Sequence, residues 1–120
     1  MWKKTMENEQ EILMIKQLIR RVIPYKKDII FFGSRAGGIY TKESDYDILV
    51  IVYQKNADRR ELAGLQAKVK RLCAKAGLDA DVIVRDNTHA KQMRNFPGNI
   101  IHSALQTGNH IYLCNIENHY

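Results

Sequence analysis

Apolar residues recur at helical spacing in two long segments of the chain. In residues 9–23 the apolar residues Ile12, Ile15, Ile19 and Val22 lie three or four positions apart, and lysines, arginines and glutamates lie on the other face. Residues 59–76 repeat this pattern. Such spacing places the apolar side chains on one face of an amphipathic helix. Pro24 and Gly77 follow the two segments directly, and both residue types are common just beyond a helix end.

Shorter apolar runs predict strands between and after these helices. The run 29–32 is continuously apolar and ends at Gly33, which is typical of a strand buried on both faces. A second run occupies residues 46–53 and a third residues 80–84. We therefore expect three interior strands.

The last third of the chain predicts smaller elements. Residues 86–88 are typical of a turn or a helix start, and residues 100–105 suggest a short helix that Gly108 closes. Residues 110–114 are suited to a final edge strand, and the tail 115–120 is expected to be flexible. The order of elements indicates an α/β (α+β) fold, a mixed sheet flanked by helices. With 120 residues and no repeat or linker, we expect one domain over residues 1–120.

The composition narrows the class of protein. A hydrophobic content of 45% and a charged content of 27% are ordinary for a globular protein. The two cysteines form no metal-binding or disulfide pattern, which fits a reducing cytoplasm. The N-terminus lacks the apolar run of a signal peptide, and every apolar run is too short to span a membrane.

The formal net charge of +6 suggests polyanionic partners, namely nucleotides, nucleic acid or an acidic protein. The excess is gathered in patches such as Arg20-Arg21, Arg59-Arg60 and Lys68-Val69-Lys70-Arg71. Each patch taken alone is also what a solvated helix face looks like. The charge therefore leaves the kind of partner open.

Three acidic residues precede or open predicted strands. Asp45 and Asp47 are two residues apart at the start of the second strand, so both carboxylates lie on one face. Like charges so close require a proton or a cation, and carboxylate oxygens suit Mg²⁺ or Mn²⁺. Asp81 opens the third strand and is the predicted third carboxylate, with Asp79 as its rival. An aspartate before a strand is common in turns, so each residue alone is weak evidence.

The residues Gly33, Ser34 and Arg35 follow the first strand. Glycine lets the backbone approach a ligand closely, and N–H groups at a helix start bind phosphate oxygens. The Ser34 hydroxyl would add a donor, and Arg35 a charge-assisted contact. A nucleotide triphosphate beside the three carboxylates would use both sets of residues.

The combination of these motifs resembles the DNA polymerase β-type nucleotidyltransferase superfamily. The segments "GSRAGG" and "ESDYDILV" are similar to its minimal nucleotidyltransferases, and the resemblance covers roughly residues 12–112. Such proteins are stand-alone catalytic domains that often act as antitoxins beside a HEPN-domain toxin. The resemblance implies a polymerase-β-like fold and transfer of a nucleoside monophosphate to a hydroxyl.

The resemblance also implies residue roles. Gly33 and Ser34 would bind the β- and γ-phosphates of ATP. Asp45 and Asp47 would ligate two Mg²⁺ ions, and Asp81 would complete the metal site and help to deprotonate the acceptor. In antitoxin members the acceptor is a tyrosine of the toxin, which makes a HEPN-domain toxin the expected partner. Gly37 stands where many relatives carry a second basic residue, which puts the turnover rate in question.

Two other functions stay open at this point. The chain could neutralise a toxin by covering its surface, with a silent metal site. It could instead modify a small molecule or an RNA end, which the basic patches allow and the small size disfavours. The nucleotide preference and the oligomeric state do not follow from the sequence.

Overall fold

The computed structural model describes residues 2–36 and 45–113, and it describes side chains from residue 9 onward except that of Ser34. The segment between the Gly-Ser turn and the paired aspartates, Gly37 included, lies outside the described residues, as does the tail 115–120. Among the described residues, no helix is both long and apolar enough to cross a membrane.

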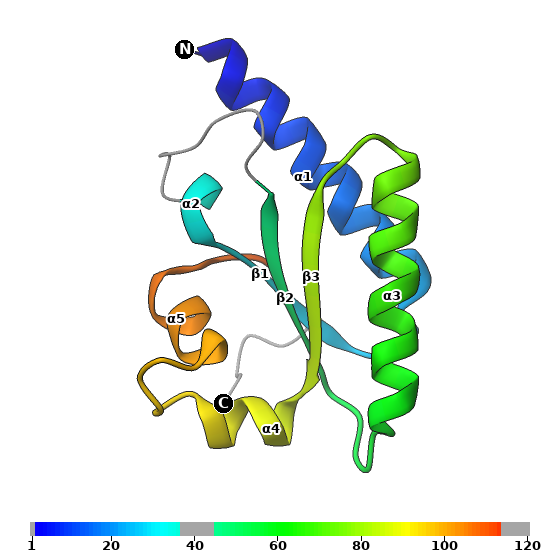
Figure 1. Cartoon of the computed structure of the whole chain (residues 1–120), viewed down its shortest axis with the longest axis vertical. Helices are drawn as coiled ribbons and strands as arrows, with labels where there is room; N and C mark the ends of the chain where they lie inside the picture. Colours follow the sequence, from blue (N-terminus) through cyan, green and yellow to red (C-terminus); the bar gives the residue numbers. More distant parts are fainter. Residues whose placement is uncertain (1, 37–44, 114–120) are drawn as a thin grey trace.

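A four-stranded mixed sheet forms the centre of the molecule, with strand order β3-β2-β1-β4 (Figure 1). Its strands are β1 (Lys27–Phe32), β2 (Tyr46–Val52), β3 (Ala80–Asp86) and β4 (Asn109–Leu113). β1 pairs antiparallel with both β2 and β4, whereas β2 and β3 are parallel. The predicted mixed sheet is confirmed.

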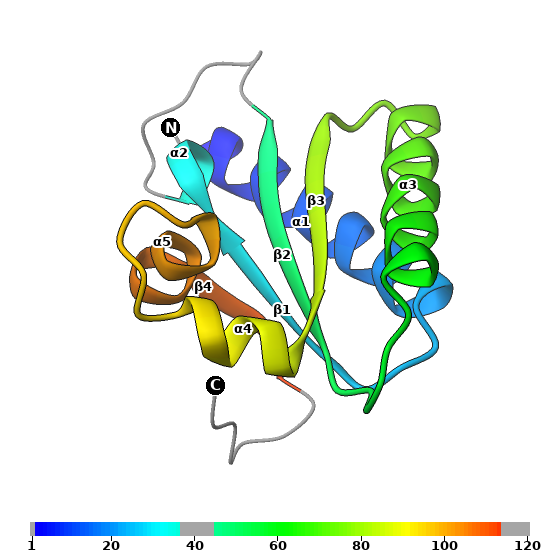
Figure 2. The ribbon, with the colours of Figure 1, turned by 60° about the horizontal axis from the view of Figure 1, so that its bottom comes forward.

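Helices cover both faces of this sheet. α1 (Trp2–Val22) and α3 (Arg59–Lys75) pack on one face, whereas α4 (Asn87–Met93) and α5 (Ile100–Thr107) pack on the other. The one-turn helix α2 (Gly33–Ala36) follows β1 at the end of the sheet where β2 and β3 begin, as Figures 1 and 2 show. The residues of the Gly-Ser turn and the aspartates therefore lie at the same end of the sheet.

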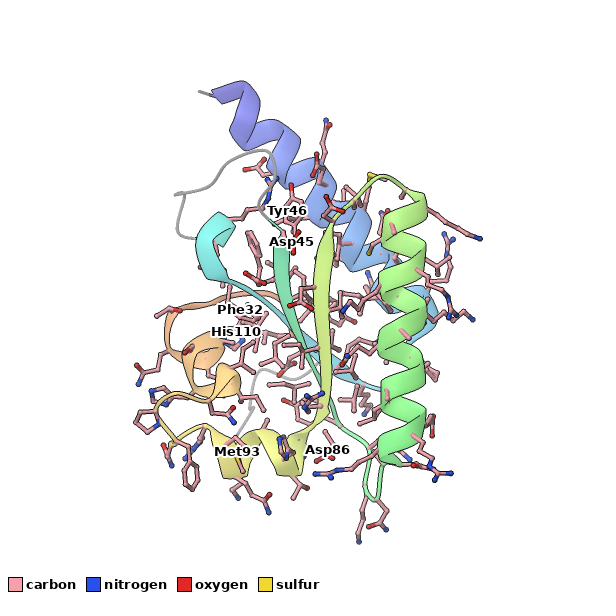
Figure 3. The ribbon with its side chains drawn as sticks, viewed as in Figure 1. Phe32, Asp45, Tyr46, Asp86, Met93 and His110 are labelled. Carbon is pink, nitrogen blue, oxygen red and sulfur yellow. The ribbon has the colours of Figure 1, made fainter. Side chains whose placement is uncertain are left out.

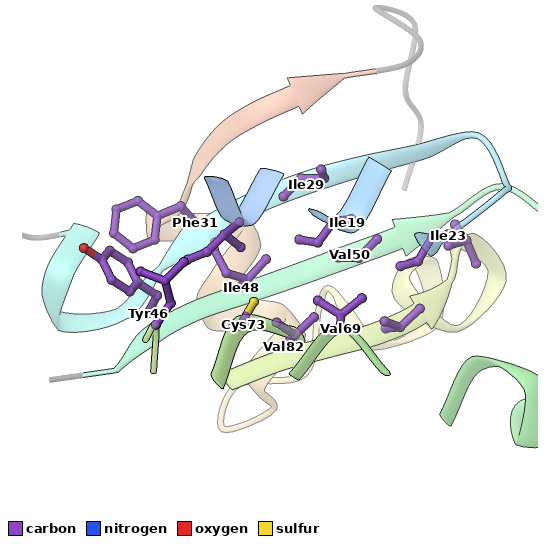
Figure 4. Close-up of a cluster of buried hydrophobic side chains, with 14 of the residues drawn as sticks. Ile19, Ile23, Ile29, Phe31, Tyr46, Ile48, Val50, Val69, Cys73 and Val82 are labelled. Carbon is purple, nitrogen blue, oxygen red and sulfur yellow. The ribbon is translucent and has the colours of Figure 1, made fainter. Parts of the chain in front are cut away.

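Alternation along β2 explains why the sheet has two cores. Ile48 and Val50 point toward α1 and α3, where they pack against Ile19 and Val69 in the larger cluster (Figure 4). Leu49 and Ile51 point the opposite way, into a smaller cluster with residues of α4 and α5. Successive strand residues face opposite sides, so a continuous apolar run is what a strand between two helical layers requires.

The structure extends several predicted elements. α1 begins at Trp2 rather than near Glu9, because the helix continues beyond the stretch that packs on the sheet. β1 begins at Lys27 although charged residues are rarely buried. Asp28 is fully buried and accepts a hydrogen bond of 2.5 Å from the Tyr53 hydroxyl, which satisfies one carboxylate oxygen inside the sheet. The apolar pattern alone could not reveal this pairing.

Helix ends follow their sequence signals more closely. The Asp58 side chain accepts a hydrogen bond from the Arg60 backbone N–H and caps α3. Gly77 has a φ of +80° directly after the last turn of α3, as the predicted C-terminal glycine should. Residues 86–88, predicted as a turn or a helix start, are the start of α4, with Asp86 as its N-cap.

Candidate functional site

The three predicted carboxylates come to one end of the sheet. Asp47 and Asp81 are register partners on the parallel strands β2 and β3. Both belong to the set of strand positions that faces α4 and α5, because Leu49 and Ile83 pack on that side. Asp45 directly precedes β2 and is exposed at its head (Figure 3). The strand register therefore makes Asp81 the neighbour of Asp47.

The electrostatics of Asp47 reflect its burial and its two acidic neighbours. Partial burial raises the pKa of the Asp47 carboxyl above its ordinary value, and the charges of Asp81 and Asp45 raise this pKa further. Each of these causes disfavours the ionised form. A cation placed among the three groups would remove the repulsion, so the donor set fits a hard divalent ion that prefers carboxylate oxygens.

Gly33 lies against the carboxylate of Asp47. Its φ is +81°, and a Cβ atom built on it would lie only 2.1 Å from Asp47 Oδ2. Phe32, the residue before it, is the register partner of Asp47 across β1 and β2. Gly33 and Asp47 are thus in direct contact, and only glycine fits beside this carboxylate.

Asp81 has a different immediate partner. Its Oδ1 lies 3.4 Å from Lys70 Nζ on α3, and both side chains are nearly half exposed. In residues 2–36 and 45–113, no three His, Cys, Asp or Glu side chains already surround one point as metal ligands would. Asp79 is exposed, and its backbone carbonyl accepts a hydrogen bond of 2.8 Å from the Tyr46 N–H.

Arg35 contacts Tyr46. Its guanidinium lies 4.2 Å from the centroid of the Tyr46 ring, and its Nη1 donates a hydrogen bond of 3.2 Å to the Tyr46 hydroxyl. The Tyr46 side chain belongs to the cluster on the α1 side of the sheet. A phosphate contact by Arg35 stays a prediction, and it would require the guanidinium to reach past the end of the sheet.

Glu11 of α1 completes this contact and was missed by the sequence reasoning. The Tyr46 hydroxyl donates a hydrogen bond of 2.5 Å to Glu11 Oε2. Tyr46 is only 2% exposed, so its hydroxyl needs such a partner. The sequence spacing carries no signal for the pairing, because it joins residues 35 positions apart. The three side chains tie α1 and α2 to the head of β2, between the two aspartates.

The substitution Tyr46→Phe should weaken both the fold and the site. It keeps the ring under Arg35 but removes hydrogen bonds to two charged groups, and we expect a loss of about 1.5–3 kcal/mol in the free energy of unfolding. Urea denaturation measures this loss. Because Tyr46 stands between Asp45 and Asp47, the KM for the predicted nucleotide substrate should also rise.

The matched control is Tyr53→Phe. It removes a hydroxyl that donates to Asp28 at the other end of β2. We expect a comparable loss of stability with an unchanged KM. Equal effects of the two variants on KM would contradict a positioning role for Tyr46.

One family model and two solved structures are similar to this chain. A family model described as a nucleotidyltransferase domain matches residues 12–103. A toxin–antitoxin crystal structure with AMP-PNP shares the fold with a TM-score of 0.53 and 23% identity, over 88% of this chain and 73% of that one. A mutant of the toxin–antitoxin MntA-HpeT gives a TM-score of 0.51 and 22% identity, over 86% and 73%. The search of curated proteins found no match.

The family match and the site agree. The matched residues include β1, the Gly-Ser turn, β2 and β3, and therefore every element that carries a predicted site residue. The solved structures independently share the arrangement of the sheet and helices. This chain belongs to the nucleotidyltransferase domain family.

Proposed function

We propose that the protein transfers AMP from ATP to a tyrosine hydroxyl of a HEPN-type toxin in the cytoplasm and thereby acts as its antitoxin. The observation that carries the proposal is the crowding of Asp45, Asp47 and Asp81 beside Gly33. Partial burial together with this crowding raises the pKa of Asp47, so a cation is favoured beside the three carboxylates.

Magnesium is the ion that we assign to this corner. Asp45 and Asp47 would ligate two Mg²⁺ ions, and Asp81 would complete the second site. The ions would supply neutralisation of the phosphate charge and polarisation of the phosphoryl group. For Asp81 to take part, its carboxylate must turn from Lys70, and an ion pair so exposed contributes little that would resist this.

The residues of the chain would act on ATP and on the acceptor as follows. The turn at Gly33 and Ser34 would hold the β- and γ-phosphates through backbone N–H groups. The acceptor oxygen forms a bond to the α-phosphorus while the bond from this phosphorus to the bridging oxygen breaks, so pyrophosphate leaves. The hydroxyl proton passes to the Asp81 carboxylate.

A protein acceptor is favoured by the solved neighbours of this chain. Both solved neighbours are toxin–antitoxin structures, and one of them contains the ATP analogue AMP-PNP. An acceptor delivered by a partner protein is consistent with both observations.

The proposal is tested by incubating the protein with labelled ATP, Mg²⁺ and the product of the neighbouring gene, which we expect to be the HEPN-type toxin. We expect the toxin to gain the mass of one adenylate on a tyrosine, and EDTA to prevent the gain. An unlabelled toxin that is still neutralised by the Asp45→Asn, Asp47→Asn double variant would instead show a binding antitoxin. Label on RNA or on a small molecule in the absence of the toxin would instead show that the protein modifies an RNA end or a small molecule.

A further inference from the structure

A cavity of about 720 Å³ opens at the other end of the sheet from the carboxylates. Its walls are the segment after β2, the first turns of α3, the end of β3 and the start of α4. Figure 2 brings this end forward, and Asp86 marks it in Figure 3. The carboxyl ends of the parallel strands β2 and β3 meet here, which is where open α/β sheets commonly bind ligands.

Two arginines of this cavity have no acidic partner among the described residues. Arg85 Nη1 donates to the Val84 carbonyl at 2.9 Å and lies 3.5 Å from Gln66 Oε1, and both acceptors are neutral. Arg59, in the first turn of α3, also lines the cavity. Within residues 2–36 and 45–113, neither guanidinium forms an ion pair with a carboxylate.

The described wall of the cavity contains one carboxylate, and its Oδ1 accepts a hydrogen bond from the backbone. Asp86 Oδ1 accepts a hydrogen bond of 2.8 Å from the His89 backbone N–H as the N-cap of α4. Arg85 is only partly exposed, and a partly buried cation without a counter-charge favours an anion from solution. Guanidinium groups bind phosphate in a bidentate manner, and two of them match the charge of a phosphate better than that of a carboxylate.

The lining also shows which ligands do not fit. The outward N–H of Val84 on the edge strand β3 donates a hydrogen bond of 2.9 Å to Gln66 Oε1, and Arg85 binds the Val84 carbonyl. These side chains close the strand edge at Val84, so an added peptide strand is disfavoured. The buried side chains of Leu62 and Val84 give an apolar floor, and the rim carries amide side chains.

We propose that this cavity is a second binding site, distinct from the nucleotidyl transfer site, for a small phosphorylated ligand held by Arg59 and Arg85. Its volume suits a ligand of up to nucleotide size. This site would give a role to Arg59. Neither Arg59 nor Arg60 takes part in the proposed transfer reaction.

The test is a titration of the full-length, metal-free protein with inorganic phosphate at constant ionic strength, followed by ¹H–¹⁵N NMR. We expect saturable shifts at amides of the cavity wall such as Ala57, Val84 and His89. Arg59→Gln and Arg85→Gln should each weaken binding about tenfold, because a charge-assisted hydrogen bond is lost. Arg60→Gln, which removes the same charge from the neighbouring residue outside the wall, should leave the affinity within about twofold of wild type.

Titrations with other ligands identify which phosphorylated ligand the cavity binds. AMP binding more tightly than inorganic phosphate at the same amides would indicate a nucleotide, and equal affinities would indicate free phosphate. The shifts should persist in Asp47→Asn, so failure of nucleotidyl transfer would leave this result intact. The proposal is overturned if no saturable shift occurs, if acetate or adenosine binds as well as phosphate, or if Arg60→Gln weakens binding as much as Arg59→Gln.

Discussion

Replacing Asp47 by asparagine should abolish nucleotidyl transfer while it stabilises the metal-free protein. The amide keeps the shape of the side chain but removes the charge that would bind the metal ion. Loss of one such electrostatic group should lower kcat by about 10²–10³-fold or more. The measurement is the rate of adenylate transfer to the toxin.

The stability change follows from the pKa of Asp47. Burial and the charges of Asp81 and Asp45 raise this pKa in the folded protein, so the folded state binds the proton more tightly than the unfolded state. Stability should then fall as the pH rises from the unfolded pKa through the folded one, and it should stay reduced at neutral pH. Asp47→Asn removes this penalty, so its Tm at pH 7 should exceed that of wild type.

Magnesium with ATP should reverse the order of the Tm values of wild type and Asp47→Asn. A ligand that binds only the folded state raises its stability, so Mg²⁺ with ATP should raise the Tm of wild type more than that of Asp47→Asn. Asp58→Asn is the matched control, because Asp58 is an exposed N-cap of α3 and asparagine caps helices equally well. If Asp47→Asn keeps wild-type activity, or if its metal-free Tm falls, the charged cluster is not the metal site.

Replacing Gly33 by alanine should remove activity and destabilise the protein, although the change adds only one methyl group. The left-handed backbone, with a φ of +81°, costs an alanine about 1–2 kcal/mol. The added Cβ would also meet Asp47 Oδ2 at 2.1 Å, so the carboxylate or the turn must shift. We expect the KM for ATP to rise and kcat to fall together, because the turn and the aspartate both move.

Gly77→Ala separates the effect of backbone strain from the effect of the contact between the added Cβ and Asp47. Gly77 has nearly the same φ of +80°, and a Cβ there meets nothing within 4 Å. Its variant should lose about 1–2 kcal/mol of stability, measured by urea denaturation, and keep full activity. A Gly33→Ala variant as active as Gly77→Ala would show that contact between the turn and Asp47 does not matter for the reaction.

The sequence by itself determined the layers of the fold and the candidate residues. The continuous apolar runs and the two helical patterns required a sheet between helices, because such side chains can be buried only in that arrangement. The spacing of Asp45 and Asp47 predicted that both carboxylates lie close together at the start of the second strand. The Gly-Ser turn and the aspartate motif were specific enough to indicate the nucleotidyltransferase family.

Only the tertiary structure decided which distant residues meet. The parallel register of β2 and β3 brought Asp81 opposite Asp47, and the contact of Gly33 with Asp47 depended on strand pairing. The hydrogen bond between Tyr46 and Glu11 and the cavity that Arg59 and Arg85 line likewise bring separate helices and strands together. Periodicity reports which face of its own element a residue occupies, whereas pairing between elements depends on register and packing, which no local pattern encodes.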